Sequence, residues 1–491
     1  MSILKDSFYA VFNRIYRTII SLVFVVLISR FLSPEQYGSY RQAILISSLL
    51  SLLLLFGLPD TIGYYYSILS YNEKNKLIST SIIIEASTSI ILAVLLFALK
   101  DSISIYMNNP KLRECMFCTA VLTVAYSLSG VLDNYYAAAG YTVLSGKMNT
   151  ILYTVYYVTA AVIIYLYRDV YLQLVLLTGF EVFKTVLMYL IIFKSEKFRF
   201  VFDKKYFKNI LIFTSPLALS SIIITMNREI DKVIVSGKFS TESFALYSNA
   251  TLTPPLLELI TVCVSIVVFP KLSQLYSEGG FKESLKLWRQ VTTNTAILLY
   301  PIVVLLLLFS ENYITFLFSE KYISGSLVLS VYMLRQITTI TIFSNLLILL
   351  EQKNKIFRNS LIGLGVNLVL NIALINTIGM VGSAVAVIVS QYLINFLEIK
   401  QILKYGNVQI EEMLDIKSLV LTLAIPSAAG ILLYLISLKL DAGKVYNLFI
   451  YGGCLMIITF LAYIRIGLIK KSFLVNVHNR FFNYRGRRFS K

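Results

Sequence analysis

Several charged side chains of this sequence lie inside long apolar stretches, where an ion is costly unless it meets a partner. Arg14 and Arg17 are one helical turn apart, and no acidic residue accompanies them in the same stretch. A second group of charges lies in the run Asn227–Lys232, and Arg335 is flanked by apolar or neutral residues. A buried guanidinium stays charged and needs an anion. These basic residues are therefore candidates for a binding site.

Acidic residues in the apolar stretches are candidates for holding a proton or Na⁺. They are Glu85, Glu181, Asp231 and Glu258. Each charged group also has a structural alternative. Glu181 and Lys184 are spaced to pair on one helix, and so are Arg228 and Asp231. Arg14 and Arg17 are close enough to a predicted membrane surface for their side chains to reach lipid phosphates.

The elements that must position these residues are membrane-spanning helices. The chain has 57% hydrophobic and 14% charged residues and a mean hydropathy of +0.75, which excludes a water-soluble globular protein. A helix needs about 20 apolar residues to cross the bilayer, so the sequence predicts about fourteen spans. We expect them at about residues 9–30, 39–59, 79–99, 115–136, 147–167, 171–193, 209–236, 243–268, 291–310, 326–350, 360–378, 380–399, 418–437 and 446–466.

The distribution of Lys and Arg predicts the orientation of these spans. Most of the 44 basic residues fall in loops that lie on one side if the N-terminus is inside, so both termini are expected in the cytoplasm. The first apolar run has no cleavage site and is expected to remain in the mature protein. The net charge of +18 is scattered over short loops, which fits contact with anionic lipids and argues against nucleic-acid binding.

The first and second halves of the sequence contain similar segments. Ser33, Glu35 and Tyr40 in the segment 31–40 match Ser240, Glu242 and Tyr247 in the segment 238–247. An even number of spans separates the copies, so the repeat is parallel. We therefore expect two six-helix lobes at residues 1–193 and 209–404, joined by an amphipathic cytoplasmic connector at 194–208. Two extra spans would follow within 405–467, and a basic tail at 468–491.

Most kinds of catalytic site are missing from the sequence. The single histidine, His478, lies in the expected tail, and no Gly-rich nucleotide-binding motif occurs. The expected outer loops are too short for an extramembrane catalytic domain. The four cysteines do not suggest a disulfide framework, and Cys115 and Cys118 are expected to be core residues. The sequence therefore predicts a protein that is not an enzyme and has no cofactor.

Three segments resemble a known family of membrane proteins. They are Phe31–Gly38, Gly57–Pro59 and Ile230–Gly237. Together with the span count and the repeat, they resemble the polysaccharide transporter branch of the multidrug/oligosaccharidyl-lipid/polysaccharide (MOP) superfamily. This branch contains the O-antigen and capsule repeat-unit flippases. The resemblance implies an all-α membrane fold with two MATE-like six-helix lobes around a central cavity.

The resemblance also implies a function and a place for the charged residues. The expected substrate is a polyprenyl-diphosphate-linked oligosaccharide, moved from the cytoplasmic to the outer leaflet of the inner membrane by alternating access. Because a diphosphate suits cationic partners, we predict that the basic residues line the cavity; these are Arg14, Arg17, Arg228, Lys232 and Arg335. H⁺ or Na⁺ coupling through the acidic residues stays open. Expected partners are membrane lipids and the polysaccharide polymerase and chain-length machinery. A lipid II flippase and a cation-coupled drug exporter are the alternatives.

Overall fold

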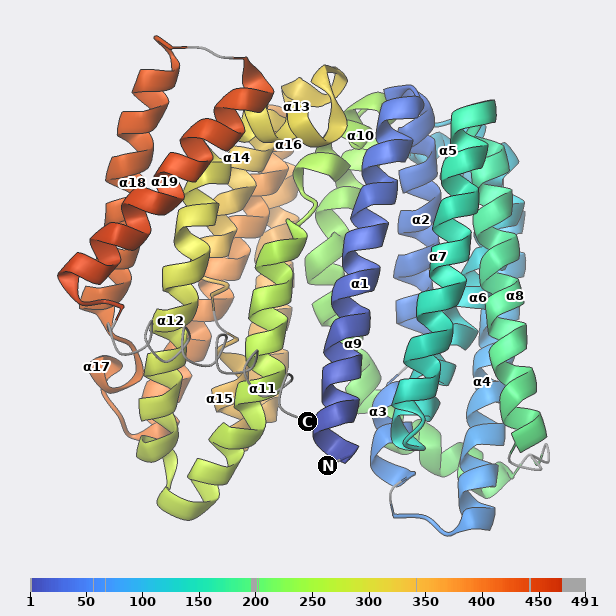
Figure 1. Ribbon diagram of the computed structural model, residues 1–491. Coiled ribbons are helices and arrows are strands. Elements are labelled where there is room, and N and C mark those ends of the chain that lie inside the picture. The colour runs from blue at the N-terminus through green and yellow to red at the C-terminus, as the bar shows by residue number, and fades with distance from the viewer. Residues whose placement is uncertain are drawn as a thin grey trace, which may run out of the picture. The chain divides into compact units, whose positions relative to one another are not determined.

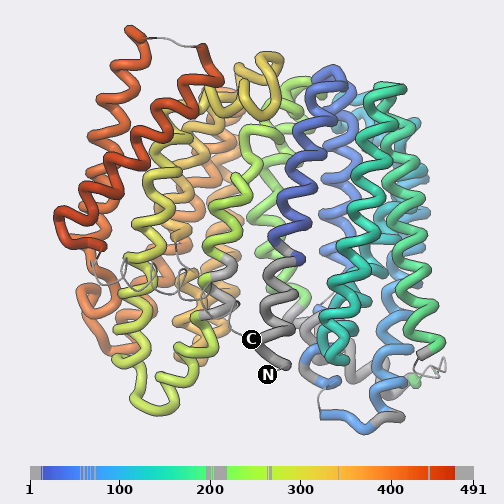
Figure 2. The backbone as a smooth tube through the Cα atoms, viewed as in Figure 1, coloured from blue at the N-terminus to red at the C-terminus, as the bar shows by residue number. Residues whose placement is uncertain are grey.

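Helices account for nearly all of the described chain in the computed structural model of this protein (Figure 1). The structure describes residues 2–469 apart from 56, 67, 196–200, 202, 341 and 441–442. The predicted basic tail therefore lies almost entirely outside the described residues, as do residues 196–200 and 202 of the predicted connector, whose last five residues begin α9. Figure 2 follows the same backbone as a tube.

The first half of the chain forms long helices separated by short turns. They are α1 (Ser2–Phe31), α2 (Pro34–Leu54), α3 (Leu58–Tyr65), α4 (Tyr71–Ala98), α5 (Lys100–Tyr106), α6 (Lys111–Ala138), α7 (Thr142–Tyr167), α8 (Val170–Ser195), α9 (Lys204–Lys238) and α10 (Thr241–Ala250). Turn residues set their ends. Gly57, for example, has a positive φ of 69° between α2 and α3, which is the backbone region that glycine tolerates best.

The second half contains more breaks. Its helices are α11 (Pro255–Gly279), α12 (Phe281–Leu308), α13 (Ser310–Phe318), α14 (Ser326–Met333), α15 (Ser344–Leu349), α16 (Lys353–Gly406), α17 (Ile410–Met413), α18 (Ile416–Ser437) and α19 (Lys444–Ile466), with the 3₁₀ turns η1 (Glu320–Gly325) and η2 (Leu334–Ile337). The span expected at 326–350 is interrupted at η2. The spans expected at 360–378 and 380–399 are both part of α16, which bends at Ile378 and Gly379.

Every predicted span coincides with at least one helix of the structure. Eight helices of the described chain are long and apolar enough to cross a membrane by length and composition. Helix α16 covers two of the predicted spans, and the spans expected at 243–268 and 326–350 are each formed by two shorter helices. The predicted all-α membrane class is confirmed.

The chain divides into two compact units. The first contains Met1–Pro255, Phe318–Gly325 and Ile356–Ile394, and the second contains Leu256–Leu317, Ser326–Lys355 and Asn395–Lys491. The lobe boundaries that follow from the repeat stay a prediction, because they describe the chain by sequence similarity, whereas these units are groups of residues in contact.

The core of the first unit is built around α6. This helix packs against α2, α4 and α8, and α1 packs along α7 (Figure 1). Buried Tyr135 and Tyr136 of α6 belong to a cluster that also includes Leu58 of α3, Ile78 of α4 and Met188 of α8. Cys115 and Cys118 are buried on α6 too, as expected for small hydrophobic side chains.

The core of the second unit joins the two C-terminal helices to α12. Leu433 of α18 and Leu455 of α19 are buried in a cluster with Val304 of α12 and Phe309. Helices α18 and α19 pack against each other and both contact α12. These two extra helices are therefore an integral part of the second unit.

The two copies of the sequence repeat begin their helices in the same way. Ser33 precedes α2 and Ser240 precedes α10, both with extended backbone, and each hydroxyl accepts a hydrogen bond of 3.2 Å from the backbone N–H three residues later. The two helices also pack against each other. At Gly38 a Cβ atom would lie only 2.2 Å from the carbonyl oxygen of Thr241, so this contact requires glycine.

Candidate functional site

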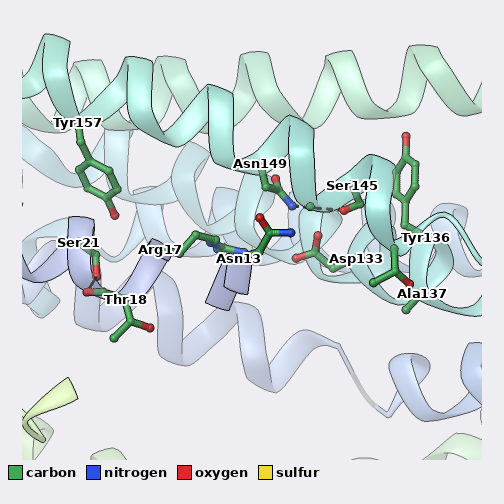
Figure 3. Close-up of a pocket in the computed structure, with 12 residues that line it drawn as sticks. Asn13, Arg17, Thr18, Ser21, Asp133, Tyr136, Ala137, Ser145, Asn149 and Tyr157 are labelled. Atoms are coloured by element: carbon green, nitrogen blue, oxygen red, sulfur yellow. Dashed lines mark hydrogen bonds between the residues drawn. The ribbon is translucent and has the colours of Figure 1, made fainter. Parts of the chain in front are cut away.

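A polar cavity of about 510 Å³ lies within the first unit. Three helices form its walls, and Figure 3 shows the side chains that line it. They are Asn13, Arg17, Thr18 and Ser21 of α1, Asp133, Tyr136 and Ala137 of α6, and Thr142, Ser145, Gly146, Asn149 and Tyr157 of α7. The volume is within the usual range for a small-molecule site, about 300–1,000 Å³.

Helical spacing brings these side chains to one place. Asn13, Arg17 and Ser21 follow one another at four-residue intervals on α1, so they lie on one face. On α7, Asn149 Nδ2 donates to Ser145 Oγ at 3.3 Å, one turn away. The α1 and α7 walls approach closely because position 146 is glycine. A Cβ atom there would lie 1.9 Å from Asn13 Nδ2.

Arg17 contributes the positive charge of the cavity. Its Cζ atom lies 4.5 Å from the centroid of the Tyr153 ring, a cation–π contact between α1 and α7. Asp133 of α6 contributes the negative charge and is exposed (Figure 3). The cavity therefore has charged groups on two walls, one of each sign among the described side chains.

A buried network lies directly behind Tyr153. The Tyr153 hydroxyl donates to Glu181 Oε1 at 3.0 Å and accepts from Lys184 Nζ at 2.8 Å. Lys184 Nζ also lies 2.6 Å from Glu181 Oε2, and both side chains are almost completely buried. The alternative in which Glu181 and Lys184 pair on one helix is the arrangement that the structure has. Tyr153 connects this pair to Arg17.

Comparison with known proteins places the chain in a family. Residues 27–326, more than half of the chain, match the family described as polysaccharide biosynthesis protein. The chain belongs to this family. It is 21% identical over 400 residues to the capsular polysaccharide biosynthesis protein CapF of Staphylococcus aureus, covering 79% of this chain and 96% of that one. It is 23% identical over 433 residues to an uncharacterized membrane protein of Methanocaldococcus jannaschii, covering 82% and 100%.

Solved structures with a similar fold are transporters. The lipid II flippase MurJ, in an inward closed conformation, matches with a TM-score of 0.75 and 17% identity, covering 94% of this chain and 99% of that one. An inward-facing multidrug resistance MATE family transporter of the MOP superfamily matches with a TM-score of 0.57 and 13% identity, covering 81% and 96%. This member of the polysaccharide biosynthesis family therefore has the MOP transporter fold, and the MATE-like fold class is confirmed.

Three of the predicted basic residues, Arg228, Lys232 and Arg335, are not among those that line the cavity of this polysaccharide biosynthesis protein. Arg228 is exposed on α9, and Lys232 Nζ lies 2.7 Å from Glu229 Oε2. Arg335 belongs to the second unit, where its Nη1 donates to the Tyr332 hydroxyl at 2.9 Å. The Arg14 side chain lies outside the described residues. Of the predicted basic side chains that the structure describes, Arg17 alone lines the cavity, and the assignment of the others to a substrate site stays a prediction.

The predicted ion-coupling acids have diverse surroundings. Glu85 is fully buried and accepts a hydrogen bond from the Ser127 hydroxyl, while its Oε2 atom has no partner among the described residues. Asp231 is fully buried and accepts a bond of 2.7 Å from the Tyr247 hydroxyl. Glu258 is exposed in the first turn of α11. Their role in coupling stays a prediction.

Among the described residues that line the cavity, Arg17 alone was predicted from the sequence, and those missed include Asp133, Asn13 and Asn149. Asp133 lies in the predicted span 115–136, so an ionisable residue in an apolar span was the signal that could have found it. Asn13 and Asn149 are single amides with no distinctive spacing. Their place in the cavity follows only from the packing of α1 against α7.

Proposed function

We propose that this transporter moves polyprenyl-diphosphate-linked oligosaccharide repeat units from the cytoplasmic to the outer leaflet of the inner membrane by alternating access. It would serve the synthesis of an O-antigen, a capsule or a related polysaccharide and would carry out no chemical reaction on its substrate. The observation that carries this proposal is the polar, Arg17-containing cavity within apolar membrane helices. Polar side chains are costly within the hydrocarbon of a membrane, so a polar cavity of this size indicates that a polar group enters it.

The position of the cavity along the helices agrees with loading from the cytoplasm. It lies where α6 ends and α7 begins, since Asp133 is near the last turn of α6 and Thr142 is the first residue of α7. With the N-terminus inside, this turn faces the cytoplasm. A repeat unit made on the cytoplasmic face would meet the cavity from the side where it is synthesised.

We propose that cationic side chains, mainly guanidinium groups with paired N–H donors, bind the substrate. A diphosphate carries several oxygens that a guanidinium can bind in pairs. The proposed contacts with the diphosphate or the sugar are Arg14, Arg17, Arg228, Lys232 and Arg335. Proton or Na⁺ coupling through Glu85, Glu181, Asp231 or Glu258 is part of the proposal, as are functional contacts with the polymerase and the chain-length machinery.

The test is the exposure of lipid-linked glycan on the outer leaflet. Cells that lack the protein should accumulate finished lipid-linked repeat units on the cytoplasmic side, and the wild-type gene should restore their exposure. Arg17→Ala, Arg228→Ala and Arg335→Ala should restore less, at equal protein level in the membrane. Accumulation of the undecorated lipid carrier in the deletion cells would overturn the proposal.

Lipid II flipping is the second candidate, because the MurJ structure shares the fold over nearly all of the chain. The two functions separate in a strain depleted of its own lipid II flippase. A repeat-unit flippase should leave that strain inviable, whereas a lipid II flippase should rescue it. A cation-coupled drug exporter would instead raise resistance to cationic drugs, a result that neither flippase predicts.

A further inference from the structure

We propose that the cavity between α1, α6 and α7 binds the saccharide part of the substrate rather than its diphosphate. This inference rests on the proposed function, because it assigns one part of the same substrate to one site. It concerns which chemical group enters the cavity, and it follows from the charge and the hydrogen-bonding groups of the lining residues.

The charges of the cavity do not suit a diphosphate. Among the described side chains that line it, those ionised at neutral pH are Arg17 and Asp133, one of each sign, so their charges cancel. The Asp133 carboxylate would repel a diphosphate in a low-dielectric environment. For a sugar ring the same carboxylate is favourable, because each of its oxygens accepts hydrogen bonds from hydroxyl groups.

The remaining lining groups match an uncharged polyhydroxylated ligand. Two amides, Asn13 and Asn149, both donate and accept hydrogen bonds, as the hydroxyls of a sugar do. Four hydroxyl side chains line the same walls, on Thr18, Ser21, Thr142 and Ser145. Tyr136 and Tyr157 add an apolar ring with a polar tip at each end of the view in Figure 3.

The Asn13 amide is held in a fixed direction at the cavity wall. Its Oδ1 atom accepts a bond of 2.6 Å from the Thr150 hydroxyl. Its Nδ2 atom packs against Gly146, where a Cβ atom would lie 1.9 Å away, so the protein covers this atom. In Figure 3 the amide lies between Arg17 and Asp133. The sugar contacts are therefore assigned to Asp133, Asn149 and the hydroxyl groups around it.

The experiment compares two ligands that differ only in the sugar. The full-length protein in nanodiscs is titrated with polyprenyl diphosphate and, separately, with the lipid-linked glycan extracted from cells lacking the protein. Asp133→Asn and Asn149→Ala should each weaken binding of the glycosylated carrier by about tenfold, the effect of losing one hydrogen bond to a charged or buried group. Binding of the bare carrier should change less than about twofold, which is below the effect of one such bond.

Matched variants control for general effects of the substitutions. Asp101→Asn removes an exposed acid that pairs with Arg113 at 2.7 Å outside the cavity, and Asn376→Ala removes an exposed amide of α16. Both should bind each ligand as the wild type does. Thermal unfolding of every variant shows whether the protein is folded before binding is compared.

The outcomes of this experiment test the inference and the proposed function separately. Equal loss for both ligands in folded cavity variants would assign the cavity to the diphosphate and overturn the inference. Unchanged binding of the glycosylated carrier would overturn it as well, with the proposed function intact. Failure of the wild type to bind either ligand would instead overturn the proposed function.

Discussion

The Tyr153 ring contacts two cations, Arg17 at the cavity and Lys184 behind it. Arg17 stacks on the ring from α1, while Lys184 of α8 donates to the hydroxyl and pairs with Glu181. The charges of Lys184 and Glu181 are taken out of water, so each depends on the other for its stability. Single substitutions in this network should therefore be much more harmful than similar substitutions on the surface.

Lys184→Met should lower the free energy of unfolding by about 3–5 kcal/mol, the usual cost of leaving one member of a buried ion pair alone. Lys286→Met is a close control, because Lys286 and Glu283 have the same i, i+3 spacing and the same distance of 2.6 Å but are exposed. It should cost less than about 1 kcal/mol. Thermal or denaturant unfolding in detergent measures both, and equal costs would contradict the role of burial.

Arg17→Lys should reduce transport although it keeps the charge. A lysine has a single ammonium group in place of the planar guanidinium, so it loses both the fork and the flat contact with the Tyr153 ring. The lost cation–π contact is worth about 0.5–2 kcal/mol. Arg113→Lys, at an exposed ion pair with Asp101, is the control and should transport normally. Full activity of Arg17→Lys in the leaflet-exposure assay would show that only the charge matters.

Glu85→Gln should leave the fold intact. The side chain is fully buried and accepts a hydrogen bond from the uncharged Ser127 hydroxyl. The amide oxygen of a glutamine can accept the same hydrogen bond. We expect the free energy of unfolding to stay within about 1 kcal/mol of the wild type, since the bond is kept and no ion pair is broken. A large loss of stability would show that the ionised carboxylate is needed. A folded variant that fails to transport would support ion coupling at Glu85.

Residue-scale prediction from the sequence succeeded for one of two pairs on a single helix. The i, i+3 spacing of Glu181 and Lys184 offered their pairing as an alternative, and the structure has it. Arg228 and Asp231 have the same spacing, but Arg228 is exposed and Asp231 is fully buried beside the Tyr247 hydroxyl. The cavity was harder, since Arg17, Asp133 and Asn149 come from three helices. Helical periodicity tells which residues share a face, but it does not tell which faces meet.

At the scale of helices, the ends were easier to predict than the interruptions. Charged and turn residues between apolar stretches marked most boundaries, including the bend of α16 at Gly379, where φ is 64°. The break of the span 326–350 at η2 was missed, because Leu334–Ile337 contains neither proline nor glycine. The predicted span 39–59 covers most of α2 and ends at the beginning of α3, so α3 was not predicted as a separate helix although Gly57 and Pro59 mark its start.

Gly38→Ala should destabilise the contact between α2 and α10. The new methyl group would meet the Thr241 carbonyl oxygen, which is backbone and cannot turn aside. Overpacking of this kind costs about 1–3 kcal/mol. Gly63→Ala on α3 is the control, because a Cβ atom there has nothing within 4 Å. It should be neutral or stabilising by up to about 1 kcal/mol, since alanine favours a helix. Unfolding experiments measure the free energy of unfolding of both variants, and equal values would contradict the tight contact at Gly38.

At the scale of the whole molecule, composition and loop charge predicted a multi-pass membrane protein, and the fold agrees. The division into two units did not follow from the sequence, because α9, α10 and most of α16 join the first unit through contacts that no local pattern encodes. The orientation in the membrane is likewise a property of the whole chain, so it is tested with labels at opposite ends of one helix.

The turn between α6 and α7 should face the cytoplasm. Tyr141→Cys, exposed in this turn, should react with a membrane-impermeant maleimide only in inverted vesicles, and Lys111→Cys at the other end of α6 only in intact cells. Cys454 is exposed and the Cys263 side chain lies outside the described residues, so both should first be replaced by serine, whereas Cys115 and Cys118 are buried. The reverse pattern of labelling would invert the topology and place the cavity on the outer side.

The contact at Gly38 has a consequence for the ancestry of the chain. Two identical subunits related by a twofold axis make each contact twice, with residue i facing residue j and residue j facing residue i. When both sides belong to one polypeptide, each position can change without the other. Gly38 faces Thr241, whereas the position equivalent to Gly38 in the second segment of the sequence repeat is Ala245. The two segments thus differ at this position, which two identical subunits cannot do.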